Sequence, residues 1–342
     1  MDLRPLNQQT LVITGATSGI GLATALMAAE RGASLVLVAR DPADLAAAAG
    51  RCREAGGPGT RVETVAADVA DHAAIELVAQ RAKEAFGGFD TWVNNAGASV
   101  YGRLEDVPME DARQVFETNY WGTVHGSLVA AAHFRERGPS GGRGMALINI
   151  GSVLSDRAIP LQGQYCATKH AIKAFTDTLR MELEKDGVPV SVSLIKPSAI
   201  NTPYPEHAAN YMPDAAPKIP EPAYEPEVVA RAILACAEKP VREVTVGAKD
   251  GVLAWASKVA PGTVDKVMEA AMFEQQKDYA GAGGPTKGAL HAPQPGSARV
   301  RGMSQKTFEH SVYTQVATRP ALSRTVGLGA VLGLAAMAFL RR

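Results

Sequence analysis

The chain has 342 residues, of which 46% are hydrophobic and 20% charged, and its 35 basic residues balance 35 acidic ones. This composition excludes a disordered chain and a disulfide scaffold, and the neutral net charge argues against a nucleic-acid partner bound through bulk charge. Three scattered cysteines are too few for a zinc site and fit a reducing compartment, so we expect a cytoplasmic protein without a bound metal. The first residues, MDLRPLNQQT, lack the apolar run of a secretory signal.

Short apolar segments alternate with helical patterns between residues 10 and 250. Most of these segments are apolar throughout, which is typical of strands that are covered on both faces. Strand–helix–strand repetition predicts right-handed crossovers and an α/β fold with a doubly wound parallel sheet. The expected strands span residues 10–14, 34–39, 61–66, 89–95, 145–150, 189–195 and 243–246, and the expected helices span residues 19–31, 42–54, 71–86, 109–137, 164–185 and 225–238.

The first expected strand is followed by the sequence TGATSGIG, which contains Gly15, Gly19 and Gly21. Glycines let the chain turn sharply and bring backbone N–H groups close to a phosphate, and a helix N-terminus adds partial positive charge. A glycine-rich turn can also occur without any ligand. The strand before this turn and the helix after it favour a dinucleotide-binding loop.

The spacing TGxxxGxG resembles the first turn of the short-chain dehydrogenase/reductase family, in its common single-domain branch. The resemblance covers about residues 8–250 and implies a Rossmann-type catalytic domain over residues 1–280, followed by a C-terminal extension. Further matches are the sequence AADV after the third strand and NNAG at the end of the fourth. The cofactor contacts that these motifs imply are Thr14, Gly15, Thr17, Ser18, Gly19, Ile20, Gly21, Asp68, Val69, Asn95, Ala96 and Gly97.

The residue after the second strand bears on the choice of nicotinamide cofactor. An acidic residue there would bind the free 2′-hydroxyl of NAD, whereas Arg40 offers a guanidinium that matches a 2′-phosphate. The neighbouring Asp41 is better explained as the N-cap of the next helix. The sequence therefore favours NADP(H), with NAD(H) still possible, and a surface Arg40 paired with solvent or with Asp44 is the alternative.

Four polar residues predict the chemistry: Asn119 inside a helix, Ser152 after the fifth strand, and Tyr165 and Lys169 one helical turn apart. Tyrosine has a pKa near 10, so a role near neutral pH requires a shift of roughly 3 units, or about 4 kcal/mol. One ammonium group at about 4 Å supplies roughly this energy at an effective dielectric constant of about 20, so we expect Lys169, aided by a positively charged nicotinamide, to lower the pKa of Tyr165. Each motif alone is common on protein surfaces, and only the set in this order indicates an enzyme.

The resemblance assigns a role to each of these residues. Ser152 would polarise a carbonyl and Tyr165 would pass a proton to or from the alcohol oxygen. Lys169 would hold the nicotinamide ribose, and Asn119 would hold a water that continues the proton relay. The nicotinamide contacts implied after the sixth strand are Pro197, Ile200 and Thr202, with Ser198 where the family often has glycine.

The implied reaction is hydride transfer between NADP(H) and a carbonyl or alcohol, with reduction as the expected direction. One alternative is a protein that binds NADP(H) as a sensor or scaffold without turnover. A second is a sugar-nucleotide epimerase or dehydratase, whose usual TGxxGxxG loop and larger C-terminal domain this sequence lacks.

Two segments interrupt the alternation. Residues 204–226 hold six prolines with three tyrosines and a methionine, so we expect a lid over about residues 203–226 and an apolar ketone or aldehyde as the substrate. Residues 281–324 are basic and rich in Gly, Pro and Ala at their start, which predicts a linker.

Residues 325–340 are uncharged and apolar, and they follow a segment in which basic residues far outnumber acidic ones. As a helix they would extend roughly 24 Å against a hydrocarbon core of about 30 Å. We therefore expect a C-terminal helix over residues 325–342 that contacts the cytoplasmic face of a membrane, or alternatively packs on the enzyme or a partner subunit. The family resemblance also implies a homodimer or homotetramer that pairs through the helices over residues 109–137 and 164–185.

Overall fold

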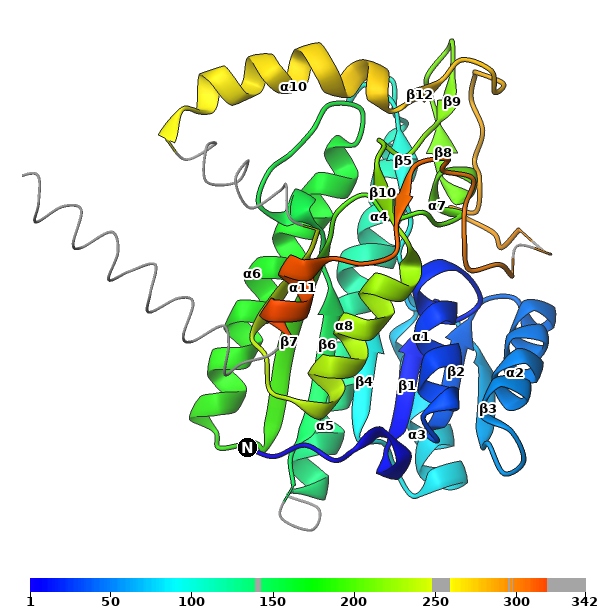
Figure 1. Cartoon of the computed structure of the whole chain (residues 1–342), viewed down its shortest axis with the longest axis vertical. Helices are drawn as coiled ribbons and strands as arrows, with labels where there is room; N and C mark the ends of the chain where they lie inside the picture. The colour runs from blue at the N-terminus through cyan, green and yellow to red at the C-terminus, as the bar shows by residue number, and fades with distance from the viewer. Residues whose placement is uncertain (139–142, 248–258, 295, 297, 319–342) are drawn as a thin grey trace, which may run out of the picture.

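The computed structural model describes residues 1–138, 143–247, 259–294, 296 and 298–318. Its centre is a seven-stranded sheet in the order β11-β7-β6-β4-β1-β2-β3, in which all neighbouring strands are parallel. Helices cover both faces of the sheet (Figure 1), which confirms the predicted doubly wound α/β fold. The strands are β1 (Thr10–Thr14), β2 (Ser34–Ala39), β3 (Val62–Ala66), β4 (Thr91–Asn94), β6 (Met145–Ile150), β7 (Val190–Pro197) and β11 (Glu243–Val246).

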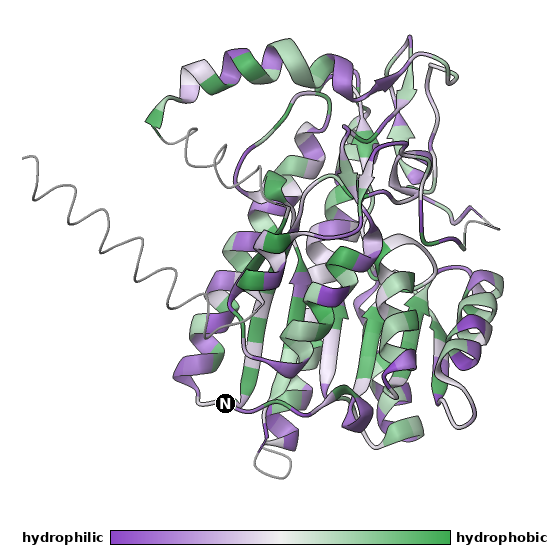
Figure 2. Cartoon of the chain, in the orientation of Figure 1, coloured by the Kyte–Doolittle hydropathy of each residue, from purple (hydrophilic) through white to green (hydrophobic). Residues whose placement is uncertain are grey.

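Two apolar cores flank the sheet, because successive side chains of a strand point to opposite faces. Leu11 and Ile13 of β1 pack with α1, α2 and α8, whereas Val12 packs with α3, α5 and α6. Figure 2 shows the strands as largely hydrophobic and the helices as mixed, as expected for strands buried on both faces. The flanking helices are α1 (Gly19–Glu30), α2 (Pro42–Gly56), α3 (His72–Phe86), α4 (Met109–Phe116), α5 (Gly122–Arg137), α6 (Gly163–Lys185) and α8 (Pro226–Glu238).

All seven predicted strands are present, with ends that differ by at most two residues. The predicted helix over residues 109–137 is helical over its whole length, but a π-helical turn over Glu117–Trp121, which the sequence does not predict, lies between α4 and α5. Gly122 follows this turn, and a Cβ there would lie 2.6 Å from Val69 Cγ2. Such wide turns are rare and often lie at functional sites, and this one carries Asn119.

The lid region is more regular than the sequence indicates. It contains α7 (Tyr204–His207), β8 (Ala209–Asn210), β9 (Ala216–Pro217) and β10 (Ala223–Tyr224), each paired or packed against another segment. The partner strands are β5 (Val100–Tyr101), β12 (Lys277–Asp278) and β13 (Thr307–Phe308). A further helix, α10 (Pro261–Gln275), is not predicted from the sequence and lies beyond one end of the sheet (Figure 1).

The residues after 280 pack on the α/β domain over much of their described length, which differs from the expected free linker. β13 pairs with β10, and α11 (Val312–Ala317) lies against β11. A Gly- and Pro-rich composition does not distinguish a spacer from an extended segment whose backbone pairs with a domain. The apolar helix expected over residues 325–340 lies outside the described residues. Among the described helices, none is both long and apolar enough to cross a membrane.

Candidate active site

A cavity of about 670 Å³ lies at the carboxyl ends of the central strands. Its wall includes residues that directly follow a strand, such as Gly15 after β1, Arg40 after β2 and Asn95 after β4. After β3 the chain crosses to β4 on the other side of β1, so the strand order reverses between β1 and β4. Open α/β sheets bind ligands at such a switch point. The cavity volume is within the range of small-molecule sites.

The glycine turn at the start of α1 requires its glycines for two different reasons. Gly15 and Gly19 have φ values of +64° and +52°, in the left-handed region that other residues rarely adopt. At Gly21 the reason is a close approach, since a Cβ there would lie 2.1 Å from the Gly15 carbonyl oxygen. The turn thereby brings the N-terminus of α1 to the cavity, where its backbone N–H groups could bind a diphosphate.

The predicted cofactor residues line the cavity, except Thr14 and Gly21. Thr14 instead joins β1 to the segment after β4, because its Oγ1 accepts hydrogen bonds from the backbone N–H groups of Asn95 and Ala96 at 3.0 and 3.1 Å. The predicted residues that line the cavity are Gly15, Thr17, Ser18, Gly19, Ile20, Arg40, Asp68, Val69, Asn95, Ala96, Gly97, Tyr165, Lys169, Pro197, Ile200 and Thr202.

Arg40 lies in the cavity wall, and its guanidinium is held by the C-terminal extension. Nη1 donates to the Leu290 carbonyl oxygen at 3.2 Å, and Nη2 donates to the Ala289 carbonyl oxygen. These bonds differ from the solvent or Asp44 pairing considered from the sequence. The Asp41 carboxylate accepts hydrogen bonds from two backbone N–H groups of α2, which confirms its role as the N-cap.

Ser152, Tyr165 and Lys169 meet at the cavity wall, although they come from the end of β6 and from α6. Lys169 Nζ lies 5.5 Å from the centroid of the Tyr165 ring and donates to the Ile150 carbonyl oxygen at 2.8 Å. Ser152 Oγ accepts a hydrogen bond from the Leu154 backbone N–H at 3.0 Å. The arrangement places a hydroxyl, a phenol and an amine at one part of the cavity.

Burial dominates the protonation of these groups. Burial raises the pKa of Tyr165 to about 12, against the opposing effect of hydrogen bonds with the Ser152 and Tyr204 side chains. Burial also lowers the pKa of Lys169 from 10.5 to about 8. The pKa of Tyr165 is therefore raised in this structure, where the sequence predicts a lowered one, because desolvation of the phenol is the largest effect. The predicted contribution of Lys169, which here donates to a carbonyl group, stays a prediction.

Asn119 lies close to this group but is absent from the residues that line the cavity. Its Oδ1 accepts from the Ala98 backbone N–H at 2.7 Å, and its Nδ2 donates to Ala98 O at 2.9 Å and to Thr168 Oγ1 at 3.1 Å. The side chain therefore joins the segment after β4 to α6. Its predicted role in holding a water stays a prediction.

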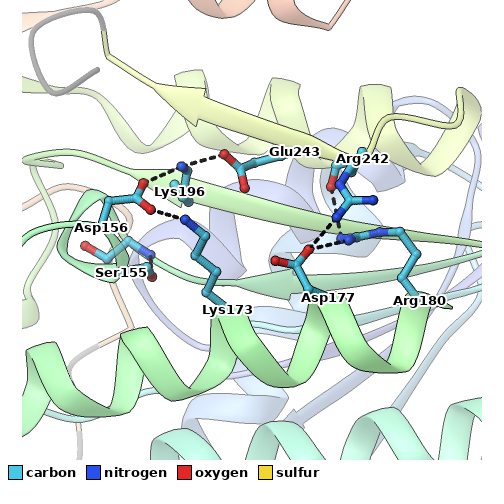
Figure 3. A network of polar contacts seen from close by, with 9 residues as sticks. Ser155, Asp156, Lys173, Asp177, Arg180, Lys196, Arg242 and Glu243 are labelled. Atoms are coloured by element: carbon cyan, nitrogen blue, oxygen red, sulfur yellow. Dashed lines mark hydrogen bonds and ion pairs between the residues drawn. The ribbon is translucent and has the colours of Figure 1, made fainter. Parts of the chain in front are cut away.

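A network of ion pairs anchors the segment that carries Ser152 (Figure 3). Asp156, just after the 3-10 turn Val153–Ser155, pairs with Lys173 of α6 and, at 2.5 Å, with Lys196 of β7. Lys196 also pairs with Glu243 of β11 at 2.5 Å. Burial disfavours the charge on Asp156, but hydrogen bonds from both lysines outweigh burial and lower its pKa. No motif in the sequence points to this network, because its members come from separate elements.

Much of the remaining wall of the cavity is aromatic and apolar, with polar residues such as Gln162 and Gln275 among them, and it comes mostly from segments whose role the sequence does not reveal. Tyr204 of α7 lies edge-on to Tyr165 and to Tyr101, with ring centroids 5.6 and 6.4 Å apart. Only the Tyr- and Pro-rich composition of the lid signals this wall in advance. The apolar residues that line this part are Leu154, Ile159, Ile219, Pro220, Met268 and Met272.

Three residues that line the cavity each have a buried polar atom with no hydrogen-bond partner in the described part of the chain: Thr118 Oγ1, Arg157 Nε and Ser198 Oγ. Buried polar groups are nearly always paired, so unpaired atoms beside one cavity are consistent with a polar ligand there. The residues present fit a nicotinamide dinucleotide. The glycine turn suits its diphosphate, Arg40 suits a 2′-phosphate, and the phenol and amine suit the reacting end.

Comparisons with known proteins agree with this fit. The family model described as short chain dehydrogenase matches residues 9–211. The protein named uncharacterized oxidoreductase YxnA of Bacillus subtilis (strain 168) is 39% identical over 337 residues, which cover 98% of this chain and 92% of the relative. The 1-deoxy-11-beta-hydroxypentalenate dehydrogenase of Streptomyces avermitilis is 36% identical over 207 residues, which cover 59% of this chain and 72% of that relative.

Two solved structures are similar over about two thirds of this chain. L-sorbose reductase from Gluconobacter frateurii, complexed with NADPH and L-sorbose, has a TM-score of 0.59 and 28% identity, covering 70% of this chain and 95% of that chain. An alcohol dehydrogenase from the archaeon Thermococcus sibiricus, complexed with 5-hydroxy-NADP, has a TM-score of 0.60 and 26% identity. The match covers 69% of this chain and 95% of that chain. The YxnA match, by contrast, extends into the residues after 280.

Proposed function

Because the chain belongs to the short-chain dehydrogenase/reductase family and is an oxidoreductase, we propose that it reduces an apolar ketone or aldehyde with NADPH. The observation that carries the proposal is the group formed by Ser152, Tyr165 and Lys169, which shares one cavity with the glycine turn. The solved relatives in complex with NADPH or 5-hydroxy-NADP support NADP(H) as the cofactor, with NAD(H) as the alternative. The apolar cavity wall supports the substrate class.

In this mechanism bound NADPH supplies the hydride that reduces the carbonyl carbon. Ser152 Oγ accepts a hydrogen bond from Leu154, and its O–H makes only a long contact of 3.5 Å to the Pro197 carbonyl oxygen. The O–H can therefore turn to donate to the carbonyl oxygen of the substrate and orient it. Tyr165 donates its phenolic proton to that oxygen as negative charge develops there, which yields the alcohol. A pKa of about 12 keeps Tyr165 protonated at neutral pH, the form that reduction requires.

Lys169 stabilises the negative charge that Tyr165 acquires when it gives up its proton. When the phenol gives up its proton, a phenolate remains with the Lys169 nitrogen 5.5 Å from its ring centroid. A protonated amine at this distance stabilises the phenolate, and the low exposure of both groups strengthens the attraction. The Ile150 carbonyl oxygen, which accepts a hydrogen bond from Nζ at 2.8 Å, keeps the amine in place.

The rate of reduction should depend on pH through Lys169. We expect kcat/KM for reduction to be level below a pH of about 8 and to fall above it, because Lys169 then loses its proton. Alcohol oxidation should instead rise with pH, since it requires the phenolate of a group whose pKa is about 12. Initial rates in both directions between about pH 6 and about pH 10 test this. A reduction rate that stays level throughout would contradict the role of Lys169.

Cofactor preference should depend on Arg40. We expect Arg40→Glu to weaken NADPH binding by about 100-fold and to leave NADH binding equal or stronger, because a carboxylate repels the 2′-phosphate and accepts a hydrogen bond from a 2′-hydroxyl. Fluorescence titration with both cofactors measures the change. Arg53→Glu, at an exposed position of α2 outside the cavity wall, is the matched control for charge. If Arg40→Glu weakened the binding of NADPH and of NADH by the same factor, this would contradict a contact between Arg40 and the 2′-phosphate.

The experiment that tests the proposed activity is an NADPH-oxidation screen over ketones and aldehydes with apolar chains of increasing length, with small polar sugars as the contrasting set. We expect turnover of the apolar carbonyls. Activity confined to polar sugars would contradict the substrate class. NADPH binding without oxidation by any carbonyl would favour the sensor or scaffold alternative.

We also propose pairing of subunits through α4, α5 and α6. Trp121, Leu128 and Met181 have exposed fractions of 44%, 47% and 57% on or beside these helices, and exposed apolar side chains in one region favour an interface. Light scattering on the purified protein would distinguish a homodimer or homotetramer from a monomer. Membrane contact through residues 325–340 stays a prediction, which fractionation of cells carrying a chain without residues 320–342 would test.

A further inference from the structure

Residues 286–294 and 298–308, which we call the C-terminal strap, are drawn in orange in Figure 1. Ala289, Pro293 and Gln294 of the strap line the cavity together with the glycine turn and the catalytic candidates. The strap is therefore a wall of the site, contributed by residues far from the rest of it in the sequence.

Both ends of the strap are joined to the lid by backbone hydrogen bonds. At one end the N–H and C=O groups of Thr286 pair with those of Asn210, at 2.9 Å in each direction. At the other end β13 pairs with β10, where the Ala223 N–H donates to Lys306 O at 3.0 Å and the Glu225 N–H donates to Phe308 O at 3.0 Å. The strap and the lid thus form one connected structure over the cavity.

Between these ends the strap contacts two groups that the proposed function assigns to the cofactor. The Gly19 N–H, at the first residue of α1, donates to Arg299 O at 3.0 Å. The Arg40 guanidinium donates to the carbonyl oxygens of Ala289 and Leu290. The proposed diphosphate site and the proposed 2′-phosphate site are therefore each connected to the strap backbone.

These contacts leave room for a ligand. The cavity of about 670 Å³ remains with the strap in its place. A guanidinium has five N–H donors, of which the two carbonyl groups use only two, so Arg40 can still bind a phosphate. A long flexible side chain that is already held in one orientation loses less freedom when its ligand binds. At Arg40 the strap should therefore assist cofactor binding, whereas at Gly19 the Arg299 carbonyl oxygen uses an N–H group that a diphosphate would have to take over.

Side chains anchor the strap beside Arg40. Leu290 is fully buried and packs in a small apolar cluster under the strap. The fully buried carboxylate of Asp111 accepts from Lys287 at 2.7 Å and lies 2.8 Å from His291 Nε2. The other members of the apolar cluster are Val100, Val107, Val115 and Ala209.

A second anchor lies nearer β13. Arg301 pairs with Glu225 at 3.2 Å and with Glu227 at 3.1 Å, at the start of α8. The Glu225 side chain is only 6% exposed, so this pair is partly shielded from water. Lys306, also on the strap, forms no ion pair within the described ranges and is exposed.

We propose that the C-terminal strap is part of the cofactor site: it holds Arg40 in position for the 2′-phosphate and slows the release of NADP(H). The inference rests on the proposed binding of NADP(H). It implies that loosening the strap affects NADPH more than NADH, because only NADPH carries the group that Arg40 contacts.

The test is the rate of cofactor release, measured by stopped-flow displacement of bound NADPH or NADH from the full chain. Leu290→Ala removes the apolar anchor next to Arg40. We expect it to raise the NADPH release rate by about tenfold and the NADH release rate by about threefold or less. Leu183→Ala is the matched control, since Leu183 of α6 is as deeply buried but belongs to a different cluster, the core between the sheet and α3, α5 and α6. Its release rates should stay within about twofold of the parent chain.

A milder pair of variants keeps the test valid if Leu290→Ala does not fold. Arg301→Ala removes two anchoring ion pairs, whereas Lys306→Ala removes the same charge from the strap without breaking an ion pair of the described residues. We expect faster NADPH release from Arg301→Ala than from Lys306→Ala. Unchanged or slower release from Leu290→Ala, or equal release from the Arg301 and Lys306 variants, would overturn the inference.

The outcomes also separate this inference from the proposed function. If the parent chain binds neither NADPH nor NADH, both fail. If it binds NADPH but reduces no carbonyl, only the proposed activity fails and the release rates still decide the role of the strap. If it reduces carbonyls while the strap variants release NADPH like their controls, only the strap inference fails.

Discussion

Tyr165→Phe is expected to lower kcat for carbonyl reduction by about 1000-fold while leaving NADPH affinity nearly unchanged. The variant keeps the ring, and with it the edge-on contact to Tyr204 at 5.6 Å, but removes the only proton that the mechanism transfers from the protein. A general acid contributes about 100- to 10,000-fold to a rate, and Ser152 alone could orient the carbonyl but not replace the lost proton. Steady-state kinetics and NADPH titration on the same preparation measure both effects.

Tyr120→Phe is the matched control for this prediction. It removes a phenolic hydroxyl from the π-helical turn, at a residue that does not line the cavity. We expect kcat within about threefold of the parent chain. Full turnover in Tyr165→Phe would refute the proposed mechanism. A rise in KM with kcat intact would show that the hydroxyl only binds the substrate.

Gly21→Ala is expected to abolish measurable NADPH binding and to lower the free energy of unfolding by about 1–3 kcal/mol. The added Cβ would lie 2.1 Å from Gly15 O and 2.6 Å from Asn95 Nδ2. The first of these atoms belongs to the backbone, so it cannot move aside without displacing the turn. Asn95 Nδ2 donates to Gly15 O and to Thr14 O, so displacement would also break these bonds between the turn and the segment after β4. Calorimetry and fluorescence titration measure the two effects.

Gly50→Ala is the matched control, because Gly50 lies inside α2 and a Cβ there meets no atom within 4 Å. Alanine is favoured over glycine inside a helix by about 0.5–1 kcal/mol, so the control should raise the Tm by about 2 °C and leave NADPH binding unchanged. If Gly21→Ala and Gly50→Ala had the same NADPH affinity and the same stability, the close approach of Gly21 to Gly15 would not be required for cofactor binding or for the fold.

Several parts of the fold and of the site follow from the sequence alone, since they depend on neighbouring residues. Strands such as Thr10–Thr14 are continuous apolar runs because both faces of the sheet are covered, and their bounds are recovered within two residues. The glycine spacing specifies the turn before α1, and a four-residue spacing places Tyr165 and Lys169 on one face of α6. These are periodicities of a single element, so no knowledge of distant segments is needed.

Other features depend on which distant segments meet. The pKa of Tyr165 is raised and not lowered, because residues from the lid and other elements bury the phenol. Arg40 is held by Ala289 and Leu290, some 250 positions further along the chain, and no local pattern encodes such a contact. The Gly- and Pro-rich segment after residue 280 has the composition of a free linker, yet its backbone pairs with the lid. Local patterns in the sequence therefore determined the elements and the reacting groups, whereas long-range packing decided their protonation, their partners and the wall that encloses them.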